Sequence, residues 1–574
     1  MSLFKYRPLS TPRSIRLLSI AETDNSSSRI LTCYLTEVSL DSPYLDYYAL
    51  SYTWGDPSQT TRILVNGEWL VVRLNIEDCL RHLRLNLYCC DRQCSCQKHS
   101  PTPVPLDHRF TFPTLLWVDA ICINQDDLDE RAQQVTLMQE IYSRASSVLV
   151  WLGRATEQTV PAFRLLLGLA NISHSSLDVG HDYIAHVIRN ECFKGHWLAL
   201  GELLQREWWH RIWTIQEVVL GSNIQVICGP YVVEWDQIIQ ATAVFEPCYR
   251  FMDELIEATI LSSTYRYLFP FQSGASRMKF IKSLKFFISR RNDPWLSQST
   301  SLNEDLAGLL GMARNYDATD PRDKIYALLG LLEELGYKSP LRVSYRVSVE
   351  DLYTQVAKIL QQDSETLNIL SHVDVNPFAR QGTLSDLPSW VPNWTVPSSH
   401  RSVAENKALP GLSQQTERTR GPNLTGNSKA KCRFPSNENI MMVEGFIFDY
   451  IHQIETRFVD LDPGVKIKGA KRYGYRIGWK PISASDQFEC HDYWLAWLGF
   501  HTEFPDPATA AVPRRVGEKT RHVDLTCFKT QATRVLGHTD VSIKVGDAIC
   551  GLMGARVPYV LRSSGNSWIF VGPW

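Results

Sequence analysis

The sequence predicts an α/β fold in its N-terminal part, followed by a mainly helical region and a β-rich C-terminal region. Between residues 47 and 153, apolar runs of strand length alternate with segments of helical period, which is the pattern of a parallel α/β sheet. Residues 160–220 and 230–375 show mainly helical patterns. From residue 440 onward, short alternating runs are separated by glycine turns, which is typical of strands.

These patterns divide the chain into five predicted regions. Residues 398–435 are rich in Ser, Asn, Gln, Gly and Arg and hold almost no large apolar residue before Phe434, so a flexible linker is expected there. The regions are an N-terminal segment (1–45), the α/β domain (46–225), a helical region (226–397), a linker (398–437) and a β-rich region (438–574).

The first predicted strands end at turn residues. The segment "RILTCYLTEVSL" (29–40) alternates as a strand does, and "YYALSYTWG" (47–55) is an apolar and aromatic run that stops before Asp56-Pro57. "TRILVNGEWLVV" (61–72) contains Asn66-Gly67, a dipeptide that accepts a positive φ at both central positions of a type I′ turn. We therefore expect two strands and then a hairpin.

Two helices and two buried strands are predicted to follow. Residues 75–84 have a helical period with Asn75 as the expected N-cap. The nearly continuous apolar run "TLLWVDAICIN" (114–124) predicts a strand buried on both faces, and so does "SSVLVWLG" (146–153). Between them, residues 126–145 predict a helix, because acids fill its first turn and apolar residues form one stripe.

One segment, "REWWHRIWTIQEVVLG" (206–221), concentrates chemistry on a predicted helix. At about 100° per residue, Arg206, His210 and Glu217 fall on one narrow polar stripe that Trp213 flanks. Two interpretations are open. The stripe is either a solvent-exposed face with an ordinary ion pair, or a site in which a carboxylate of raised basicity lies beside an aromatic platform.

The composition argues against several classes of protein. The 574 residues carry a net charge of −2, which gives no electrostatic footprint for nucleic acid or for an anionic membrane surface. No apolar stretch reaches about 18 residues and no secretory signal is visible, so we expect no membrane span and a cytoplasmic location. Fourteen cysteines in such a chain suggest reduced thiols rather than a disulfide framework.

A thiol-rich segment, "YCCDRQCSCQKHSP" (88–101), could in principle bind zinc. Its four cysteines and one histidine do not follow the usual spacing, in which CxxC-type pairs lie apart on separate turns. The segment falls between a predicted helix and a predicted strand. A loop without a metal is the favoured interpretation, with metal binding as the alternative.

Three blocks of the sequence together resemble the fungal heterokaryon-incompatibility (HET) domain: "YYALSYTWGD" (47–56), the segment 115–153 that begins "LLWVDAICINQ", and "REWWHRIWTIQEVVLG" (206–221). Segments 320–332, 387–394 and 546–562 resemble sequences that commonly follow this domain. The resemblance implies non-self recognition and regulated cell death. It also implies self-association, with another incompatibility protein as the trigger.

HET domains in turn resemble Toll/interleukin-1-receptor (TIR) domains, a flavodoxin-like α/β class. Several TIR domains cleave NAD with a glutamate on a helix that carries a Trp-containing motif, and "WWHRIWTIQE" (208–217) is similar to that motif. The resemblance implies Glu217 as the catalytic residue, with NAD as a substrate and no bound cofactor. A carboxylate there could stabilise the oxocarbenium character of the departing ribose. The alternative is a non-catalytic signalling and self-assembly module.

The other site candidates follow from where ligands bind in open α/β sheets, beyond the carboxyl ends of the strands. Each of them also has a structural interpretation: Trp54 could cap the core, Asn124 could be a turn residue with Asp126 as a helix cap, and Asp119 could form a buried ion pair with Arg211. The expected substrate-binding residues are Tyr52, Trp54, Asp56, Asp119, Asn124, Gln125, His210 and Trp213, and no metal ligand is expected.

Overall fold

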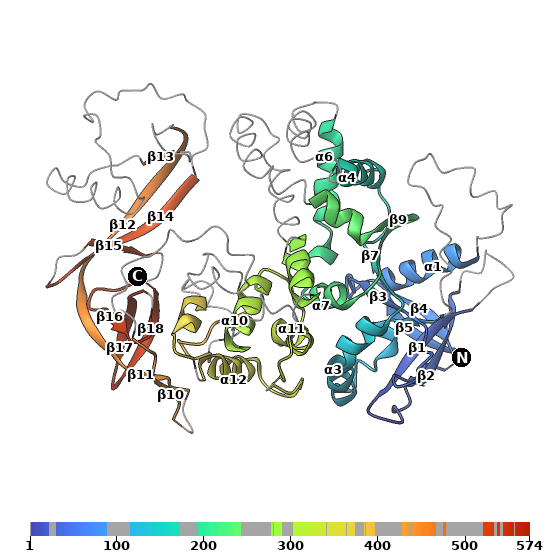
Figure 1. Ribbon diagram of the computed structural model, residues 1–574, viewed down its shortest axis with the longest axis horizontal. Helices are drawn as coiled ribbons and strands as arrows, with labels where there is room; N and C mark the ends of the chain where they lie inside the picture. The colour runs from blue at the N-terminus through green and yellow to red at the C-terminus, as the bar shows by residue number, and fades with distance from the viewer. Residues whose placement is uncertain are drawn as a thin grey trace. The chain divides into compact units, whose positions relative to one another are not determined.

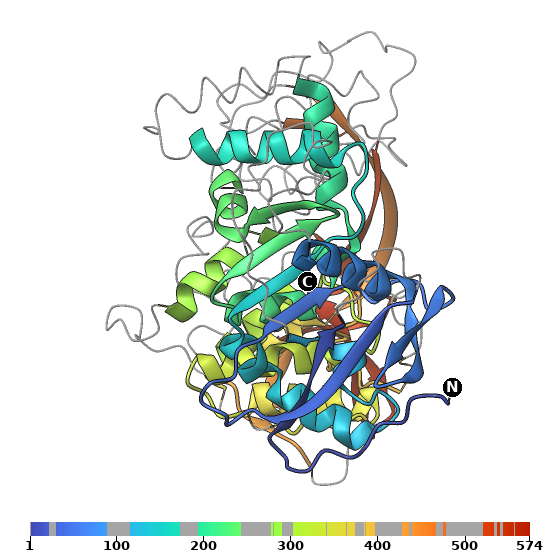
Figure 2. The same cartoon turned by 90° about the vertical axis from the view of Figure 1, so that its right-hand side faces the viewer.

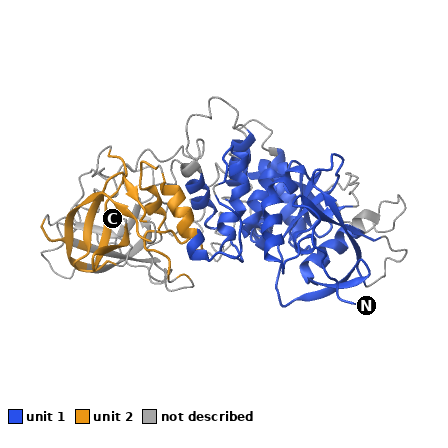
Figure 3. Ribbon diagram, turned by 90° about the horizontal axis from the view of Figure 1, so that it is seen from below, with its two compact units in different colours: residues 1–352, 407–413 blue, residues 353–406, 414–574 orange. Residues whose placement is uncertain are grey.

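The computed structural model divides the chain into two compact units, residues 1–352 with 407–413 and residues 353–406 with 414–574 (Figure 3). The described residues are 2–21, 30–88, 115–172, 193–242, 277–278, 280–289, 302–339, 341–362, 364–373, 384, 386–396, 428–435, 439–465, 474–477, 521–532, 536–539, 543–555 and 557–573.

Nine described strands of the first unit form one mixed sheet in the order β5-β4-β2-β1-β6-β3-β7-β8-β9 (Figure 1). Its centre, β6-β3-β7-β8, is parallel, whereas β9 and the β1–β2 and β4–β5 pairs are antiparallel. The strands are β1 (Ser14–Ile20), β2 (Thr32–Ser39), β3 (Tyr48–Tyr52), β4 (Thr60–Val65), β5 (Glu68–Arg73), β6 (Leu116–Trp117), β7 (Ser147–Trp151), β8 (Ile224–Cys228) and β9 (Tyr231–Glu234). The predicted α/β fold is therefore confirmed.

Helices cover both faces of this sheet. Figures 1 and 2 show α1 on one face and α3 with α7 on the other, and α3, α7 and α11 pack together. Covered on both faces, β7 and β8 are buried at every residue, as parallel strands usually are. The helices of this unit include α1 (Leu74–Tyr88), α2 (Asp119–Cys122), α3 (Leu128–Arg144), α4 (Thr159–Ile172), α6 (Lys194–Leu204), η3 (Glu207–His210), α7 (Trp213–Leu220), α10 (Leu302–Ala313) and α11 (Asp323–Glu334).

The order of the parallel strands creates a crevice. Counted along the chain, β3, β6, β7 and β8 are the first to fourth parallel strands, and they lie in the order 2-1-3-4. The connections from β3 and from β6 therefore leave in opposite directions. In open α/β sheets such a switch point is where ligands bind, beyond the carboxyl ends of the strands.

The predicted hairpin is confirmed. β4 and β5 pair from Thr60–Arg73 to Val65–Glu68, and the turn between them has φ values of 51° at Asn66 and 84° at Gly67. These two positive angles are those of a type I′ turn, which asparagine and glycine tolerate best.

The strand predicted over residues 114–124 is largely wrong. Only β6 is extended, and the chain then turns into α2, whose first residue is Asp119. The Asp119 carboxylate accepts from the N–H of Ala120 at 2.7 Å, and its carbonyl accepts from the Gln125 amide at 2.9 Å. A short apolar run fits a buried helix as well as a buried strand, so periodicity alone could not separate them.

The predicted N-cap at Asn75 is also wrong, because α1 begins at Leu74 and Asn75 lies in its first turn. The Asn75 amide donates to the Thr53 carbonyl at 2.6 Å and accepts from Trp151 Nε1 at 3.2 Å. A Cβ on Gly55, which has a φ of +76°, would lie 3.2 Å from the Asn75 Cβ. Asn75 therefore holds the loop after β3 against β7 instead of capping a helix.

α3 confirms the helix predicted over residues 126–145. Its N-cap is Asp127, one residue after the candidate cap Asp126, and the Asp127 carboxylate accepts from the N–H groups of Asp129 at 3.0 Å and Glu130 at 3.1 Å. These bonds satisfy two donors that the first helical turn cannot pair internally.

Replacing Asp127 with alanine is expected to lower the free energy of unfolding by about 1 kcal/mol, because both capping bonds are lost. Asp126→Ala is the matched control, and it should cost less. Urea denaturation of the two variants beside the wild type measures both effects. An equal loss in the two variants would contradict the cap assignment.

The single helix predicted over residues 206–220 is wrong. The chain forms η3, becomes extended at Arg211 with φ −72° and ψ 130°, and resumes as α7. The break is made by Asp317, whose carbonyl accepts from the N–H of Ile212 at 2.9 Å and whose N–H donates to the carbonyl of His210 at 2.5 Å. Arg206, His210 and Glu217 therefore do not share a stripe.

β1 is a strand that the sequence patterns do not predict. A charged residue interrupts its apolar run, yet Arg16 is buried and its guanidinium contacts Glu130 at 2.6 Å and 2.9 Å. The short β8–β9 hairpin was likewise not predicted. The helical patterns after it are confirmed by α10 and α11.

The second unit confirms the β-rich C-terminal prediction. Its larger sheet is antiparallel in the order β15-β14-β12-β16-β17-β18, with β13 beside β12, and its core holds Ile451, Phe528, Ile549 and Val560. Helix α12 (Val349–Gln361) begins in the last residues of the first unit and continues into the second. The other elements of the second unit include η4 (Asn368–His372), β10 (Cys432–Arg433), β11 (Met442–Val443), β12 (Gly445–Val465), β13 (Gly474–Ile477), β14 (Arg521–Thr530), β15 (Leu536–Thr539), β16 (Ala548–Leu552), β17 (Tyr559–Ser564) and β18 (Ser567–Pro573).

The predicted cysteine cluster from Cys89 to His99 lies entirely outside the described residues. Most of the predicted linker 398–437 lies outside them as well. Within the part of the chain that the structure describes, no helix combines the length and the apolar character that crossing a membrane requires.

Candidate active site

A cleft of about 860 Å³ lies beyond the carboxyl ends of β3 and β6. The loop after β3 supplies Thr53, Trp54 and Gly55, the start of α2 supplies Asp119, and the segment 317–323 before and at the start of α11 forms another wall. The cleft is lined by Thr53, Trp54, Gly55, Arg73, Asp119, Ile123, Gln125, Arg131, Val135, Met138, Glu207, Arg211, Trp213, Asp317, Ala318, Thr319, Asp320, Pro321, Arg322, Asp323 and Tyr345.

Asp119 connects the cleft to the interior. Its Oδ2 accepts from Trp54 Nε1 at 2.9 Å and from Arg211 Nη2 at 3.2 Å. Both donors line the cleft, and the Asp119 side chain is 9% exposed. The carboxylate thus orients one indole and one guanidinium at the cleft surface.

Arg211 lies between two buried carboxylates. Its Nη1 is 3.6 Å from Glu217 Oε1 and donates to the carbonyl of Tyr52 at 2.6 Å, while Nη2 binds Asp119. Burial alone would lower the pKa of Arg211, but Glu217 and Asp119 together raise it above its ordinary value. The guanidinium stays charged and fixes the distance between the two acids.

Glu217 is the innermost member of this chain of contacts and is 0% exposed. Its Oε2 accepts a short hydrogen bond from the Ser51 hydroxyl, which also accepts from Trp208 Nε1 at 2.8 Å. Burial raises the pKa of Glu217 to about 7, against the opposing effect of Arg211 and the Ser51 hydrogen bond. The solvent-exposed interpretation of this residue is therefore wrong.

The second wall of the cleft is built around Asp323, which is buried at the start of α11. Trp213 Nε1 donates to its Oδ2 at 3.1 Å, and the Tyr345 hydroxyl donates to its Oδ1 at 2.8 Å. Burial raises the pKa of Asp323, and the hydrogen bonds from Tyr345 and Trp213 oppose that rise. The indole of Trp213 is thereby fixed along the cleft.

The sequence around α7 does not predict this wall, because the wall lies about a hundred residues further along the chain. For four residues of this wall, the sequence predicts no more than a place in a helical region: Asp320, Arg322, Asp323 and Tyr345. A usable signal was present in "DPRDKIYALLGLL" (320–332), where charged residues cluster at the start of an otherwise apolar helix.

Comparison with known proteins points to one family. The family model "Heterokaryon incompatibility protein (HET)" matches residues 106–217, which include Asp119, Arg211 and Glu217. This segment is similar to a HET domain.

One curated relative supports this assignment over a longer stretch. The chain is 28% identical over 450 residues to "Heterokaryon incompatibility protein 6, OR allele" of Neurospora crassa. The match covers 68% of this chain and spans 60% of the length of that protein. No solved structure matches the chain.

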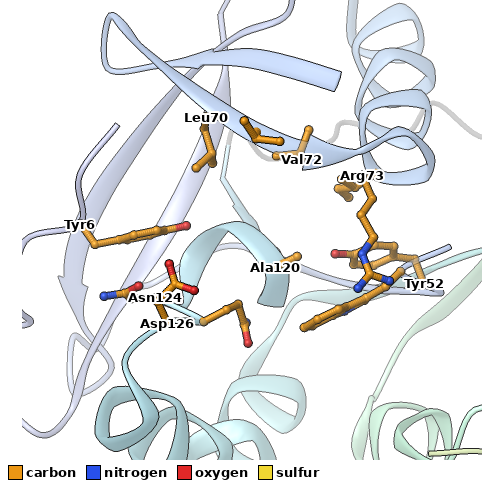
Figure 4. Close-up of a pocket in the computed structure, with 12 residues that line it drawn as sticks. Tyr6, Tyr52, Leu70, Val72, Arg73, Ala120, Asn124 and Asp126 are labelled. Atoms are coloured by element: carbon orange, nitrogen blue, oxygen red, sulfur yellow. The ribbon is translucent and has the colours of Figure 1, made fainter. Parts of the chain in front are cut away.

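A smaller pocket of about 240 Å³ adjoins the HET domain cleft. Trp54, Arg73 and Gln125 line both cavities, and Figure 4 shows Arg73 projecting from the end of β5 toward Tyr52. Tyr52 is buried, and burial and Asp119 raise the pKa of its hydroxyl. The remaining wall is formed by Tyr6, Leu70, Val71, Val72, Ile76, Ala120, Asn124 and Asp126.

The structure brings most of the predicted site residues of the HET domain together. Trp54, Asp119, Gln125 and Trp213 line the large cleft, and Tyr52 and Asn124 line the small pocket with Trp54 and Gln125. Glu217 lies behind Arg211 and does not line either cavity.

Two predicted residues lie elsewhere. The Asp56 carboxylate accepts from the N–H and hydroxyl of Ser58 at 2.9 Å and 2.7 Å within a turn. His210 is half-buried beside Arg277, and burial and that arginine lower its pKa.

Two other predicted site residues, Asn124 and Asp119, each combine a structural contact with a place in a cavity wall. The Asn124 carbonyl accepts from the N–H of Asp127 in a turn, so Asn124 is a turn residue as well as a pocket residue. Asp119 pairs with Arg211 and lines the cleft at the same time. Among the described residues, no three His, Cys, Asp or Glu side chains are grouped so as to hold a metal ion.

Proposed function

We propose that this protein acts in heterokaryon incompatibility, as a non-self recognition protein that triggers regulated cell death, and that its HET domain binds and cleaves NAD. The incompatibility role is supported by the family match and by the relative from Neurospora crassa. The proposed location is the cytoplasm, and the proposed partners are a second copy of the chain and another incompatibility protein as trigger, with neither nucleic acid nor a membrane.

The observation that carries the enzymatic part is the cleft itself. Two indoles, Trp54 and Trp213, line it, and a carboxylate–arginine–carboxylate chain leads inward from Asp119 to Glu217. Indoles can stack on a base or on nicotinamide, and perturbed carboxylates in clefts are candidates for catalysis. The 2-1-3-4 order of the parallel strands agrees with a flavodoxin-like, TIR-like arrangement and with a ligand at the switch point.

The proposed chemistry needs a carboxylate near the ribose. Breaking the bond between nicotinamide and ribose develops positive charge on the sugar, which a carboxylate stabilises. Glu217 is proposed for this role, and Arg211 has to move aside for it to reach a ligand, because the guanidinium stands between Glu217 and the cleft. Nicotinamide leaves as a neutral ring, so no strong general acid is required.

The test is release of nicotinamide from NAD by the full chain at high protein concentration. Wild type is expected to release it, and Glu217→Gln is expected to lose activity by about 100-fold or more. Glu140→Gln is the control, because Glu140 pairs with Arg13 on the surface away from the cleft. Equal rates in wild type and Glu217→Gln would rule out the catalytic role.

A second candidate, a non-catalytic signalling and self-assembly module, is favoured by the burial of Glu217, which is 0% exposed. In that case Glu217 and Arg211 only hold the fold together. Cell killing in a fungal host would then survive Trp54→Ala and other changes in the cleft, whereas the enzymatic proposal expects those changes to abolish it.

A further inference from the structure

Four arginines line the large cleft, and two of them are hydrogen-bonded to acids. Arg211 lies between Asp119 and Glu217. Arg322 donates two hydrogen bonds to the Asp320 carboxylate, at 2.9 Å and 3.0 Å, and a third to the carbonyl of Val347 at 3.0 Å. Neither guanidinium is available to a ligand without breaking these contacts.

Arg131 is held differently. Its guanidinium carbon lies 3.6 Å from the centre of the Tyr345 ring, so the ring supports one face of the cation. The carboxylates of Asp320 and Asp323 are 3.7 Å and 4.0 Å away, beyond hydrogen-bond distance. Both acids have closer partners, because Asp320 is gripped by Arg322 and Asp323 accepts from Trp213 and Tyr345.

Arg73 repeats this arrangement on the side of the cleft that faces the small pocket. Its guanidinium carbon lies 5.1 Å from the centre of the Trp54 ring, and its Nη1 donates to the carbonyl of Gly55 at 2.7 Å. Among the described residues no carboxylate forms an ion pair with it. Arg73 and Arg131 are thus two cations at one cleft, each over an aromatic ring and each with N–H groups available to a ligand.

We propose that Arg131 and Arg73 bind phosphate groups of the cleft's ligand, so that a phosphate-bearing nucleotide binds more tightly than the nucleoside without phosphates. A guanidinium fork matches the oxygens of a phosphate, and stacking on a ring removes much of the entropy that binding would otherwise cost. The Arg131 side chain is 23% exposed, so a ligand in the cleft can reach it. This inference deepens the proposed function and rests on it for the identity of the nucleotide.

The inference also assigns a binding role to residues beyond the matched HET segment. Tyr345 supports Arg131, and Asp323 fixes both Tyr345 and Trp213. Residues 106–217 match the family model, and these two residues follow well after them. Phosphate recognition therefore depends on the part of the first unit that follows the HET domain.

The experiment is calorimetric titration of the full chain with ADP-ribose, which carries two phosphates, and with adenosine, which carries none. Arg131→Gln is expected to weaken ADP-ribose binding about tenfold or more and to leave adenosine binding unchanged. Arg73→Gln should act in the same direction, and Arg131→Lys should recover part of the loss. Arg144→Gln is the control, because Arg144 lies at the other end of α3 and pairs with Glu140 at 3.1 Å.

The outcomes separate this inference from the proposed function. ADP-ribose binding that depends on Arg131 supports the phosphate site, even if no variant and no wild-type protein releases nicotinamide from NAD. Cleavage of NAD with an unchanged KM in Arg131→Gln and Arg73→Gln would overturn the phosphate site and leave the enzymatic proposal standing. Equal loss of ADP-ribose and adenosine binding in Arg131→Gln, with a lowered unfolding temperature, would also overturn it, since the arginine would then only support the fold.

Discussion

Glu217→Gln is expected to abolish a pH dependence of stability that Glu217 causes in the wild-type protein. Through this residue, the free energy of unfolding of the wild type falls by about 3 kcal/mol as the pH rises from below 4.5 to above 7. The pKa of Glu217 is about 7 in the folded protein and has an ordinary value of 4.5. Because the folded pKa is the higher one, the folded state binds the proton more tightly. That stabilisation is complete below the unfolded pKa and is lost as the pH passes through the folded pKa. Glutamine resembles the protonated acid and does not titrate.

The measurement is the free energy of unfolding of wild type and Glu217→Gln by urea at several pH values between 4 and 8. The difference between the two proteins isolates Glu217, since all other groups titrate in both. It should shift in favour of the glutamine variant as the pH rises. A difference that stays constant with pH would contradict the raised pKa.

Arg211→Met has the second large expected effect, a destabilisation of about 3–5 kcal/mol at pH 7. Removing the guanidinium leaves Asp119 and Glu217 buried without their common cation. A buried charge that loses its partner costs far more than the pair contributed. Chemical denaturation of the variant beside the wild type measures the loss.

The double variant Arg211→Met/Glu217→Gln tests the reason for that loss. Arg211 lowers the pKa of Glu217, so the acid carries an uncompensated charge in Arg211→Met only at a pH above 7. Glutamine removes that charge, so the double variant should recover part of the stability lost in Arg211→Met when both are compared at high pH. Purely additive costs of the two changes would show that the two residues are not coupled.

These two expectations concern the same physical feature. One continuous chain of contacts runs from the core to the cleft through Ser51, Glu217, Arg211, Asp119 and Trp54. The free-energy cost of desolvating a buried ion pair can exceed the gain from its Coulombic attraction. A chain of such pairs is therefore weak evidence of a purely stabilising role. Its defined geometry at the cleft surface is what makes a functional role the better explanation.

The parts of the fold that local physics decides could be predicted from the sequence. Asn66-Gly67 specifies its turn through backbone sterics, and the acids and apolar stripe of residues 126–145 specify a helix. The run at 47–55 marks the buried strand β3, so Trp54 could be placed beyond its carboxyl end. The position of the cleft follows from this reasoning, since ligand sites in such sheets lie at that edge.

Other features depend on partners far away in the sequence. Asn75 is a good helix cap by composition, yet hydrogen bonds to Thr53 and Trp151 place it elsewhere. The apolar run at 114–124 fits a strand or a helix, and only the packing around Asp119 selects α2.

The residues of the candidate site likewise fall into those that the sequence predicts and those that only the tertiary structure places. The sequence by itself determined the resemblance to HET domains, the buried strand β3 and the residues Trp54, Asp119 and Trp213, because these depend on patterns within short segments. Only the tertiary structure decided that the 206–220 segment breaks at Arg211, that Glu217 lies behind this arginine, and that Asp323 and Tyr345 close the cleft. The physical reason is that each of these depends on a contact between segments far apart in the chain, such as the backbone pairing of Asp317 with His210 and Ile212, which no local periodicity encodes.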